Sequence, residues 1–162
     1  MRTSLTPTIR HRLEVQGYAC SDAPAFARIV PWLRFTPALC TFVVAVGTAL
    51  RAPGILWSLV PLAALGAIFP RHPFDLLYNA TVRHLAGTAP LPPNGAPRRF
   101  ACGMAAAWLI PTAWAFTAGD LWAGYILGTI LVAAGAVVSV SHVCIPSIVY
   151  NALLRPRRAS TG

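Results

Sequence analysis

The sequence that decides the fold is LWAGYILGTILVAAGAVVSVSHVCIPSIVYNALLR, residues 121–155. From Leu121 to Val140 this stretch contains no Asp, Glu, Lys, Arg or His. About 20 apolar residues are enough for an α-helix to cross the hydrocarbon core of a bilayer. The stretch therefore predicts a transmembrane helix, over residues 121–143, that ends beside an imidazole at His142 and a thiol at Cys144.

Three more apolar runs precede this helix, at residues 35–50, 55–70 and 100–118. A turn signal at residues 51–54 joins the first two runs, and Gly119-Asp120 joins the third to the last. Such short connections make neighbouring helices antiparallel. The sequence therefore predicts an all-α membrane protein whose four transmembrane helices form two tandem hairpins.

The composition agrees with a membrane protein. Of the 162 residues, 56% are hydrophobic and only 10% are charged, whereas soluble domains carry about 25% charged residues. All 13 basic residues are arginine and the net charge is +9, which on its own would also suit a nucleic-acid-binding protein. In a membrane protein, basic residues gather at the cytoplasmic ends of helices. We therefore expect the lipid bilayer as a partner and no nucleic acid.

The positions of the arginines predict the orientation. If the N-terminus is cytoplasmic, only Arg51 lies outside, and this asymmetry places both termini in the cytoplasm. The predicted domains are a cytoplasmic segment (1–22), a transmembrane domain (23–155) and a basic tail (156–162). Within the domain we expect an interfacial helix at 23–34, an amphipathic helix at 73–85 and a Pro-rich cytoplasmic linker at 86–99.

Three short motifs occur twice, in the same order, which indicates an internal duplication. The pairs are residues 34–35 with 99–100, residues 54–57 with 119–122, and residues 78–80 with 150–152. The first two pairs are 65 positions apart and the third is 72 apart. Two copies with an even number of spans have the same orientation, so the repeat would be parallel. Each copy would be a hairpin followed by a short cytoplasmic interfacial helix.

The sequence resembles the bacterial integral membrane family called domain of unknown function 4395. The resemblance rests on Arg99-Phe100-Ala101 with Gly103, on His72-Pro73 and on Cys144, and it covers residues 20–155. It implies a four-span protein of the bacterial inner membrane with no established activity. Many members carry a second cysteine three residues after the first, where this chain has Ser147, so a dithiol reaction is not implied here.

Cys144 is the candidate reactive thiol. It precedes Pro146, a residue favoured in the first turn of a helix, and a helix N-terminus or a nearby cation lowers the pKa of a thiol. His142 would then serve as its base. The alternative is a small packed residue and a capping imidazole where the span ends.

His72, His142 and Cys144 are also candidate ligands of a metal site, although histidines at membrane edges often serve as hydrogen-bonded anchors. No cofactor is expected. Cys40 is interpreted as a packing residue, and helix geometry separates Cys102 from Cys144 by roughly 12 Å in height, so no disulfide between them is expected.

Three functions are compatible with these features. The spans contain no Asp, Glu, Lys or Arg, and the sequence has no metalloprotease, phosphate-binding or nucleophile-elbow motif, so an enzyme is not favoured. The first hypothesis is a scaffold or accessory subunit of a membrane assembly, with a membrane-protein partner or a second copy of itself. The alternatives are a thiol- or sulfur-handling protein using Cys144, and a small channel or carrier for a neutral or sulfur-containing solute.

Overall fold

The structure is a computed structural model that describes residues 6–20 and 24–154. All regular secondary structure in these residues is helical. The predicted basic tail at 156–162 lies outside the described residues. The helices are α1 (Pro7–Val15), α2 (Pro24–Ile29), η1 (Val30–Arg34), α3 (Phe35–Ala49), α4 (Pro53–Ile68), α5 (Pro73–Leu77), η2 (Tyr78–Val82), α6 (Arg83–Ala86), α7 (Ala96–Thr117), α8 (Leu121–Ser141) and α9 (Ile145–Leu153).

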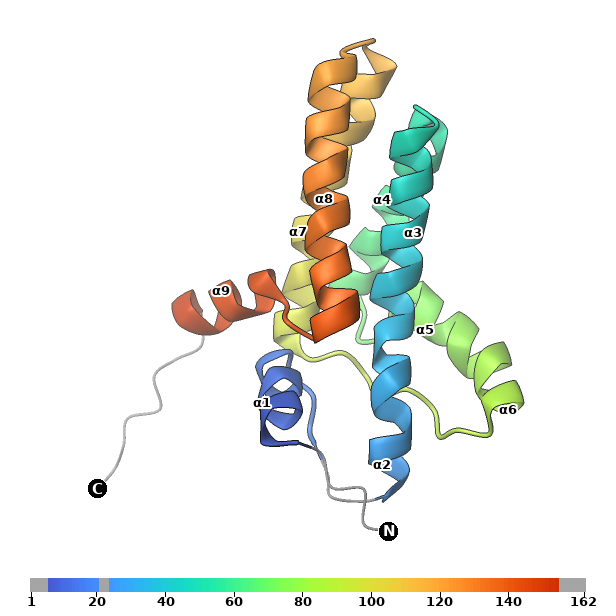
Figure 1. Ribbon diagram of the computed structural model, residues 1–162, viewed down its shortest axis with the longest axis vertical. Helices are drawn as coiled ribbons and strands as arrows, with labels where there is room; N and C mark the ends of the chain where they lie inside the picture. The colour runs from blue at the N-terminus through green and yellow to red at the C-terminus, as the bar shows by residue number, and fades with distance from the viewer. Residues whose placement is uncertain (1–5, 21–23, 155–162) are drawn as a thin grey trace.

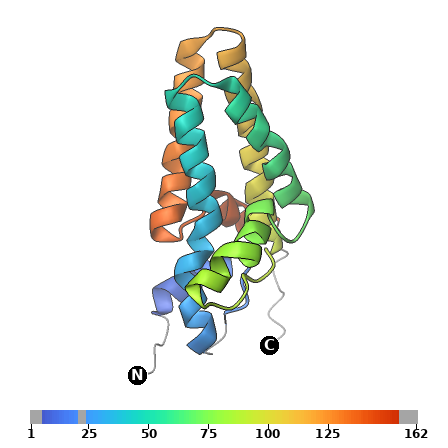
Figure 2. The same cartoon turned by 90° about the vertical axis from the view of Figure 1, so that its right-hand side faces the viewer.

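The four long helices α3, α4, α7 and α8 form a bundle (Figures 1 and 2). Each hairpin packs internally, α3 on α4 and α7 on α8, and the two hairpins join through α4 on α7 and α3 on α8. The short helices α1, α5, α6 and α9 surround one end, which we call the basal end and which is at the bottom of Figure 1. The two tight turns lie at the opposite, distal end.

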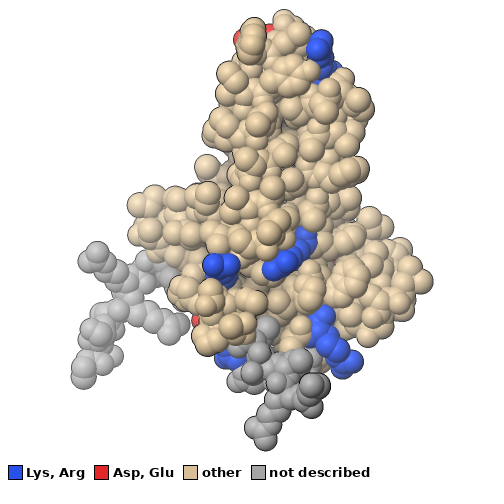
Figure 3. Space-filling view, viewed as in Figure 1, with Lys and Arg blue, Asp and Glu red and all other residues tan. Residues whose placement is uncertain are grey.

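Three helical segments are long and apolar enough to cross a membrane: Ala25–Ala49, Ala96–Thr117 and Leu121–Ser141. A fourth is α4 together with the helix that follows it, Pro73–Ala86, which bends away by 85°. Large apolar side chains such as Phe42, Trp122 and Val140 are exposed along the bundle. On the face shown in Figure 3, arginine is seen near the distal tip and over the basal half, with an uncharged surface between these two regions. These features are those of a membrane protein.

The first apolar helix is longer than the sequence predicted. Residues 24–34, expected as a separate interfacial helix, run directly into α3 (Figure 1). Pro31 has no N–H for an α-helical hydrogen bond, and the chain passes it as the tighter 3₁₀ segment η1 without changing direction. Trp32 then packs its ring against Tyr78, with 5.4 Å between centroids. Similarly, α7 takes its first turns from the end of the predicted linker and begins at Ala96.

A short helix follows α4 and another follows α8, as predicted. The first begins with a capping box in which the His72 side chain and Asp75 satisfy the free N–H groups. The second begins after α8 ends at His142, whose left-handed backbone (φ 57°) redirects the chain. The sequence did not predict α1, which packs at the basal end through Leu13 and is tied to α8 by Arg12, whose guanidinium donates to the Ser141 carbonyl.

Candidate functional site

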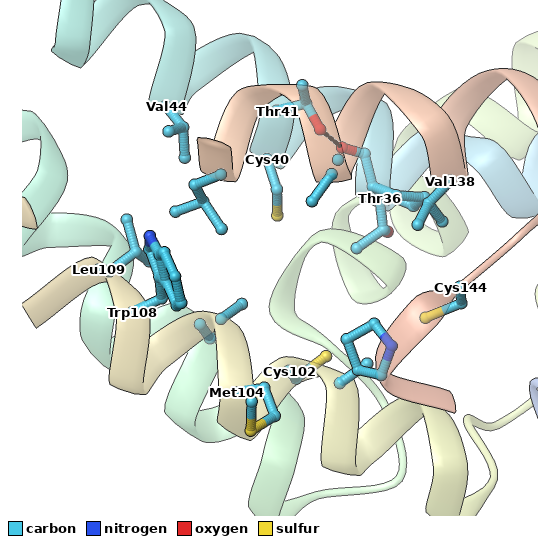
Figure 4. A pocket seen from close by; sticks show the side chains of 18 of the residues that line it. Thr36, Cys40, Thr41, Val44, Cys102, Met104, Trp108, Leu109, Val138 and Cys144 are labelled. Atoms are coloured by element: carbon cyan, nitrogen blue, oxygen red, sulfur yellow. Dashed lines mark hydrogen bonds between the residues drawn. The ribbon is translucent and has the colours of Figure 1, made fainter. Parts of the chain in front are cut away.

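A partly open cavity of about 340 Å³ lies between the long helices, and its lining includes the exposed side chains of Met104 and Ile130. Its volume is within the size range of small-molecule sites. Side chains of α3, α4, α7 and α8 line it, and the start of α9 closes its basal end. Most of the lining is aliphatic or aromatic, including Val44, Leu59, Trp108 and Leu109. Figure 4 shows Val44 and Leu109 at one side of this cavity and Cys144 at the other.

Three of the four cysteines line the cavity: Cys40 from α3, Cys102 from α7 and Cys144 at the start of α9. Figure 4 shows all three sulfur atoms directed toward the cavity, and all three thiols are free. The sequence had separated Cys102 from Cys144 in height. Both nevertheless line the same cavity, since α8 ends at Ser141 and the left-handed backbone of His142 redirects the chain.

The basal end of the cavity is polar, and its main group is Arg98. The Arg98 side chain is only 8% exposed. Its guanidinium donates to Gln16 Oε1 and to the Leu33 carbonyl, both at 3.3 Å, and lies 5.3 Å from the centre of the Tyr18 ring. Burial raises the pKa of the Tyr18 hydroxyl, so this ring stays neutral beside the guanidinium.

His72 also lines this end and is 2% exposed. Its Nδ1 accepts a hydrogen bond from the backbone N–H of Phe74 at 3.2 Å, and the backbone N–H of His72 donates to Asp75 Oδ2 at 3.2 Å. Burial lowers the pKa of His72, so the ring is neutral at pH 7. Because Nδ1 is an acceptor, the proton of the neutral ring is on Nε2.

Asp75 is the acceptor around which this network forms. It accepts hydrogen bonds from Thr36 Oγ1 and Asn94 Nδ2 as well as from the backbone of His72. The carboxylate thereby joins α5 to α3 and to the linker before α7. Its acceptor capacity is used inside the protein.

His142 lies at the end of α8 and does not line the cavity. Its Nε2 accepts a hydrogen bond from Arg34 Nε at 2.7 Å, and its carbonyl accepts one from Gln16. Burial, and then the charges of Arg34, Arg98 and Arg12, lower the pKa of His142 to about 4. The ring is therefore neutral at pH 7 and supplies no positive charge to Cys144. Its Nε2 lone pair is already occupied, so the geometry gives no support to its predicted role as a base.

Cys144 is placed as the sequence predicted, as the N-cap of the short helix that carries Tyr150 and Asn151. Its side chain is 6% exposed and does not cap that helix. Its reactivity stays a prediction. The candidate metal ligands are divided, since His72 and Cys144 line the cavity and His142 binds Arg34. Among the described residues, no group of three or more His, Cys, Asp or Glu could hold a metal ion.

The sequence analysis missed Arg98 and Gln16. Arg98 lies at the start of an apolar helix, where an arginine is expected as an anchor in the lipid head groups, so its type and position gave no signal. Gln16 belongs to α1, and its place under the bundle depends on contacts with residues more than 80 positions away.

No curated protein and no solved structure shows a significant match to this chain. One family model, described as "Domain of unknown function (DUF4395)", matches residues 30–155. The match contains α3, α4, α7 and α8, the three cavity cysteines, Arg98 and His72. It confirms the resemblance predicted from the sequence, and its description states no activity. Since the match covers most of the chain, the protein belongs to the DUF4395 family.

Proposed function

We propose that this protein is a four-span protein of the bacterial inner membrane that binds or carries a small, largely apolar solute between two parallel repeats. The observation that carries the proposal is the cavity at the centre of the bundle, lined from both hairpins. A large apolar cavity with a few converging polar groups is the usual form of a small-molecule site. A scaffold, the first hypothesis from the sequence, needs no such cavity.

The packing of the helices supports the parallel repeat. A rotation about the bundle axis that carries α3 to α7 and α4 to α8 also carries the α4–α7 contact onto the α8–α3 contact. Equivalent aromatic pairs occur at equivalent places. Phe35 and Tyr78 have ring centroids 5.4 Å apart, and Phe100 and Tyr150, their counterparts in the second copy, are 5.6 Å apart.

The cavity lies where the axis of such a repeat would pass. Val44 and Leu109, which are 65 positions apart, both line it, and so do Cys40 and Ala105. At the basal end, His72 and Cys144 are 72 positions apart, and each is the N-cap of the helix that follows its hairpin. A solute in the cavity would therefore contact both copies, as expected when binding occurs at the interface of two repeats.

The orientation proposed from the arginines agrees with the position of the basal end. Arg12, Arg34, Arg98 and Arg99 all bind groups there. Arg51 is at the distal turn, where it contacts Tyr125. With the basal end in the cytoplasm, this distribution follows the positive-inside rule.

Thiol or sulfur chemistry is the second candidate function, because three thiols line the same cavity. A sulfur-containing solute held there would lie beside them. Thiols in apolar surroundings are unreactive unless a base or a positive charge favours the thiolate. Arg98 supplies a positive charge at the basal end of the cavity, but the geometry provides no free base at His142. The cavity itself is the stronger observation, so solute binding is the better-supported function.

A cavity-filling substitution tests solute binding. The probe is decanol carrying a photoreactive diazirine on its chain, added to liposomes that contain the purified protein. Mass spectrometry would measure labelling of cavity residues relative to lipid-facing residues such as Ile126, which is 56% exposed. Ala105→Phe fills the cavity and should lower this ratio about tenfold, equivalent to about 1.4 kcal/mol of binding free energy.

The matched control is Ala107→Phe, on the same helix and exposed outside the cavity, which should leave the ratio unchanged. Cavity labelling no stronger than labelling of the lipid-facing residues in the wild-type protein would refute the proposal. Equal effects of the two substitutions would refute it as well.

A further inference from the structure

We propose that the cavity recognises an amphiphile with an anionic head group, a carboxylate or a phosphate, which contacts Arg98 while the apolar chain lies between the helices. This inference rests on the proposed function and names the class of its solute. It also gives a role to the charged residue that is buried at the basal end of the cavity.

The first argument is the lack of a counter-ion for Arg98. Within the described residues its guanidinium contacts an amide oxygen, a carbonyl oxygen and an aromatic ring, and no carboxylate. The two hydrogen bonds, at 3.3 Å, are long for charge-assisted bonds. A buried charge without an ionic partner is costly, and within a membrane protein such a charge usually marks a binding site.

Asp75 interacts with Arg98 electrostatically, but no acid in the described residues forms a direct ion pair with the guanidinium. Asp75 is occupied by Thr36, Asn94 and the backbone of His72. Of the other acids in the described residues, Glu14 is exposed on α1 and Asp120 caps α8 at the distal end. Arg98 therefore has no direct ionic partner in the described residues, and a bound anion would supply one.

The second argument is that this end of the cavity is rich in donors. The neutral His72 ring carries its proton on Nε2, which has no hydrogen-bond partner among the described residues, and the ring lines the cavity. Gln16 uses its amide oxygen for Arg98 and its amide nitrogen for the His142 carbonyl. Two buried donors, on Arg98 and His72, thus face the cavity and can bind the oxygens of an anionic head group.

The third argument comes from comparing the two short helices. In α5 the third residue is Asp75, whose carboxylate binds the free backbone N–H of the N-cap residue. The equivalent residue in α9 is Ser147, whose hydroxyl instead donates to the Pro97 carbonyl. No side chain caps α9, and its first residues, Ile145 and Pro146, line the cavity. The positive end of an uncapped helix would add to the attraction of an anion.

The test compares two photoreactive probes that differ only in the head group. Decanoate and decanol would carry a diazirine at the same carbon, and labelling would be measured in liposomes well above the carboxyl pKa. For each probe, cavity labelling is divided by labelling of the lipid-facing residue Ile126, which corrects for partitioning into the bilayer. The wild-type protein should favour decanoate about tenfold, and Arg98→Gln should abolish this preference while decanol still binds.

Arg99→Gln is the matched control. It removes the same charge one residue away, where Arg99 binds the Ala67 and Ile68 carbonyls outside the cavity, and it should leave the preference unchanged. If Arg98→Gln also loses decanol, the protein has lost its fold, and Arg98→Lys is used instead. Arg98→Lys keeps the positive charge and should keep the preference for decanoate, and equal labelling by the two probes would overturn the inference.

The outcomes separate the two proposals. If neither probe labels the cavity of the wild-type protein, solute binding itself is wrong. If decanol and decanoate label it equally, or if Arg98→Gln leaves the preference intact, solute binding stands and recognition of an anion is wrong. A third probe, the corresponding decyl phosphate, distinguishes the two head groups, because the preferred one gives the larger ratio.

Discussion

At the scale of single residues, His142 joins the end of α8 to the arginines of the basal end. Its ring is 4% exposed and binds Arg34 through Nε2. A protonated ring could not accept this hydrogen bond, and its charge would lie beside Arg34, Arg98 and Arg12. The folded protein therefore holds His142 in its neutral form.

This state of His142 predicts a loss of stability in mild acid. The pKa of His142 is about 4 in the folded protein, whereas an unfolded histidine has a pKa of about 6.5. As the pH falls from about 6.5 to about 4, the unfolded chain binds a proton that the folded protein does not. The free energy of unfolding should fall by up to about 1.4 kcal/mol per pH unit within that window. Thermal unfolding in detergent micelles at a series of pH values measures the slope.

His142→Gln is the test variant, since its amide oxygen can accept the Arg34 hydrogen bond without titrating. The slope should become smaller in this variant. It should not vanish, because burial also lowers the pKa of His72, which acts in the same direction. An unchanged slope would show that His142 is not held neutral by the fold.

Single residues also show which parts of the site the sequence could predict. The place of Cys144 follows from local chemistry, because Pro146 favours the start of a helix and the apolar run before it has ended. The role of Arg98 has no such local signal. It arises because α1 folds back and places Gln16 and Tyr18 around a guanidinium that the sequence alone assigns to the lipid head groups.

At the scale of helices, the approach of α8 to α3 depends on two glycines. A Cβ atom at Gly128 would lie 2.5 Å from Thr48 Oγ1 and 2.6 Å from its Cγ2. Gly135 has a similar relation to Thr41, one heptad further along the same face. Small residues on a helix face allow such close packing, and here they bring α8 against α3.

Substitution of Gly128 should therefore separate the two helices. Gly128→Ala is expected to destabilise the protein by about 1–3 kcal/mol, because the threonine has to move or the helices have to separate. Gly103→Ala is the matched control. A Cβ there would lie 3.6 Å from the Ala67 Cβ, an ordinary contact, so no loss of stability is expected and helix propensity favours a gain of up to about 1 kcal/mol. Melting temperatures in detergent compare the two variants, and equal losses would contradict the packing argument, because alanine has a higher helix propensity than glycine at both positions.

Helix boundaries were predictable only where a strong local signal exists. The distal turn was predicted from the residue types Gly119-Asp120. In the structure Gly119 adopts the left-handed backbone (φ 81°) that glycine allows, and Asp120 caps α8. The start of the first apolar helix was missed because residues 23–34 were predicted as an interfacial helix separate from the apolar run at 35–50. Pro31 lies within this helical segment and does not end it. Trp32 and Phe35, just after it, pack on Tyr78.

At the scale of the whole molecule, the order of helices around the bundle is set by long-range packing. The four apolar runs and their pairing into hairpins follow from the sequence, since runs and turns are local features. Which face of one hairpin meets the other does not, and neither does the cavity between them. The contacts of α4 with α7 and of α3 with α8 depend on side chains distributed over the whole chain.

The number of crossings decides between two arrangements of the whole molecule, and accessible cysteines can distinguish them. In one arrangement α4 crosses the membrane and Pro73–Ala86 lies on its cytoplasmic surface. In the other, the 85° bend makes α4 and Pro73–Ala86 a re-entrant loop, which leaves three crossings. The parallel repeat requires the first arrangement, because only an even number of spans in each copy returns the chain to the same side.

Single cysteines would be placed at Ala52, Ala89 and Ala118 in a chain whose natural cysteines are replaced by alanine. With four crossings and a cytoplasmic N-terminus, a membrane-impermeant maleimide should label positions 52 and 118 in intact spheroplasts. Position 89 should react only after permeabilisation. Because Ala89 is exposed in the structure, a lack of reaction before permeabilisation would mean that the membrane protects it, and not burial in the protein. With three crossings, positions 52 and 89 would share the outer side, and 118 would be protected. Labelling of position 89 from outside would therefore remove both the four-span topology and the parallel repeat, while labelling of 52 and 118 alone leaves the two hairpins in the same orientation.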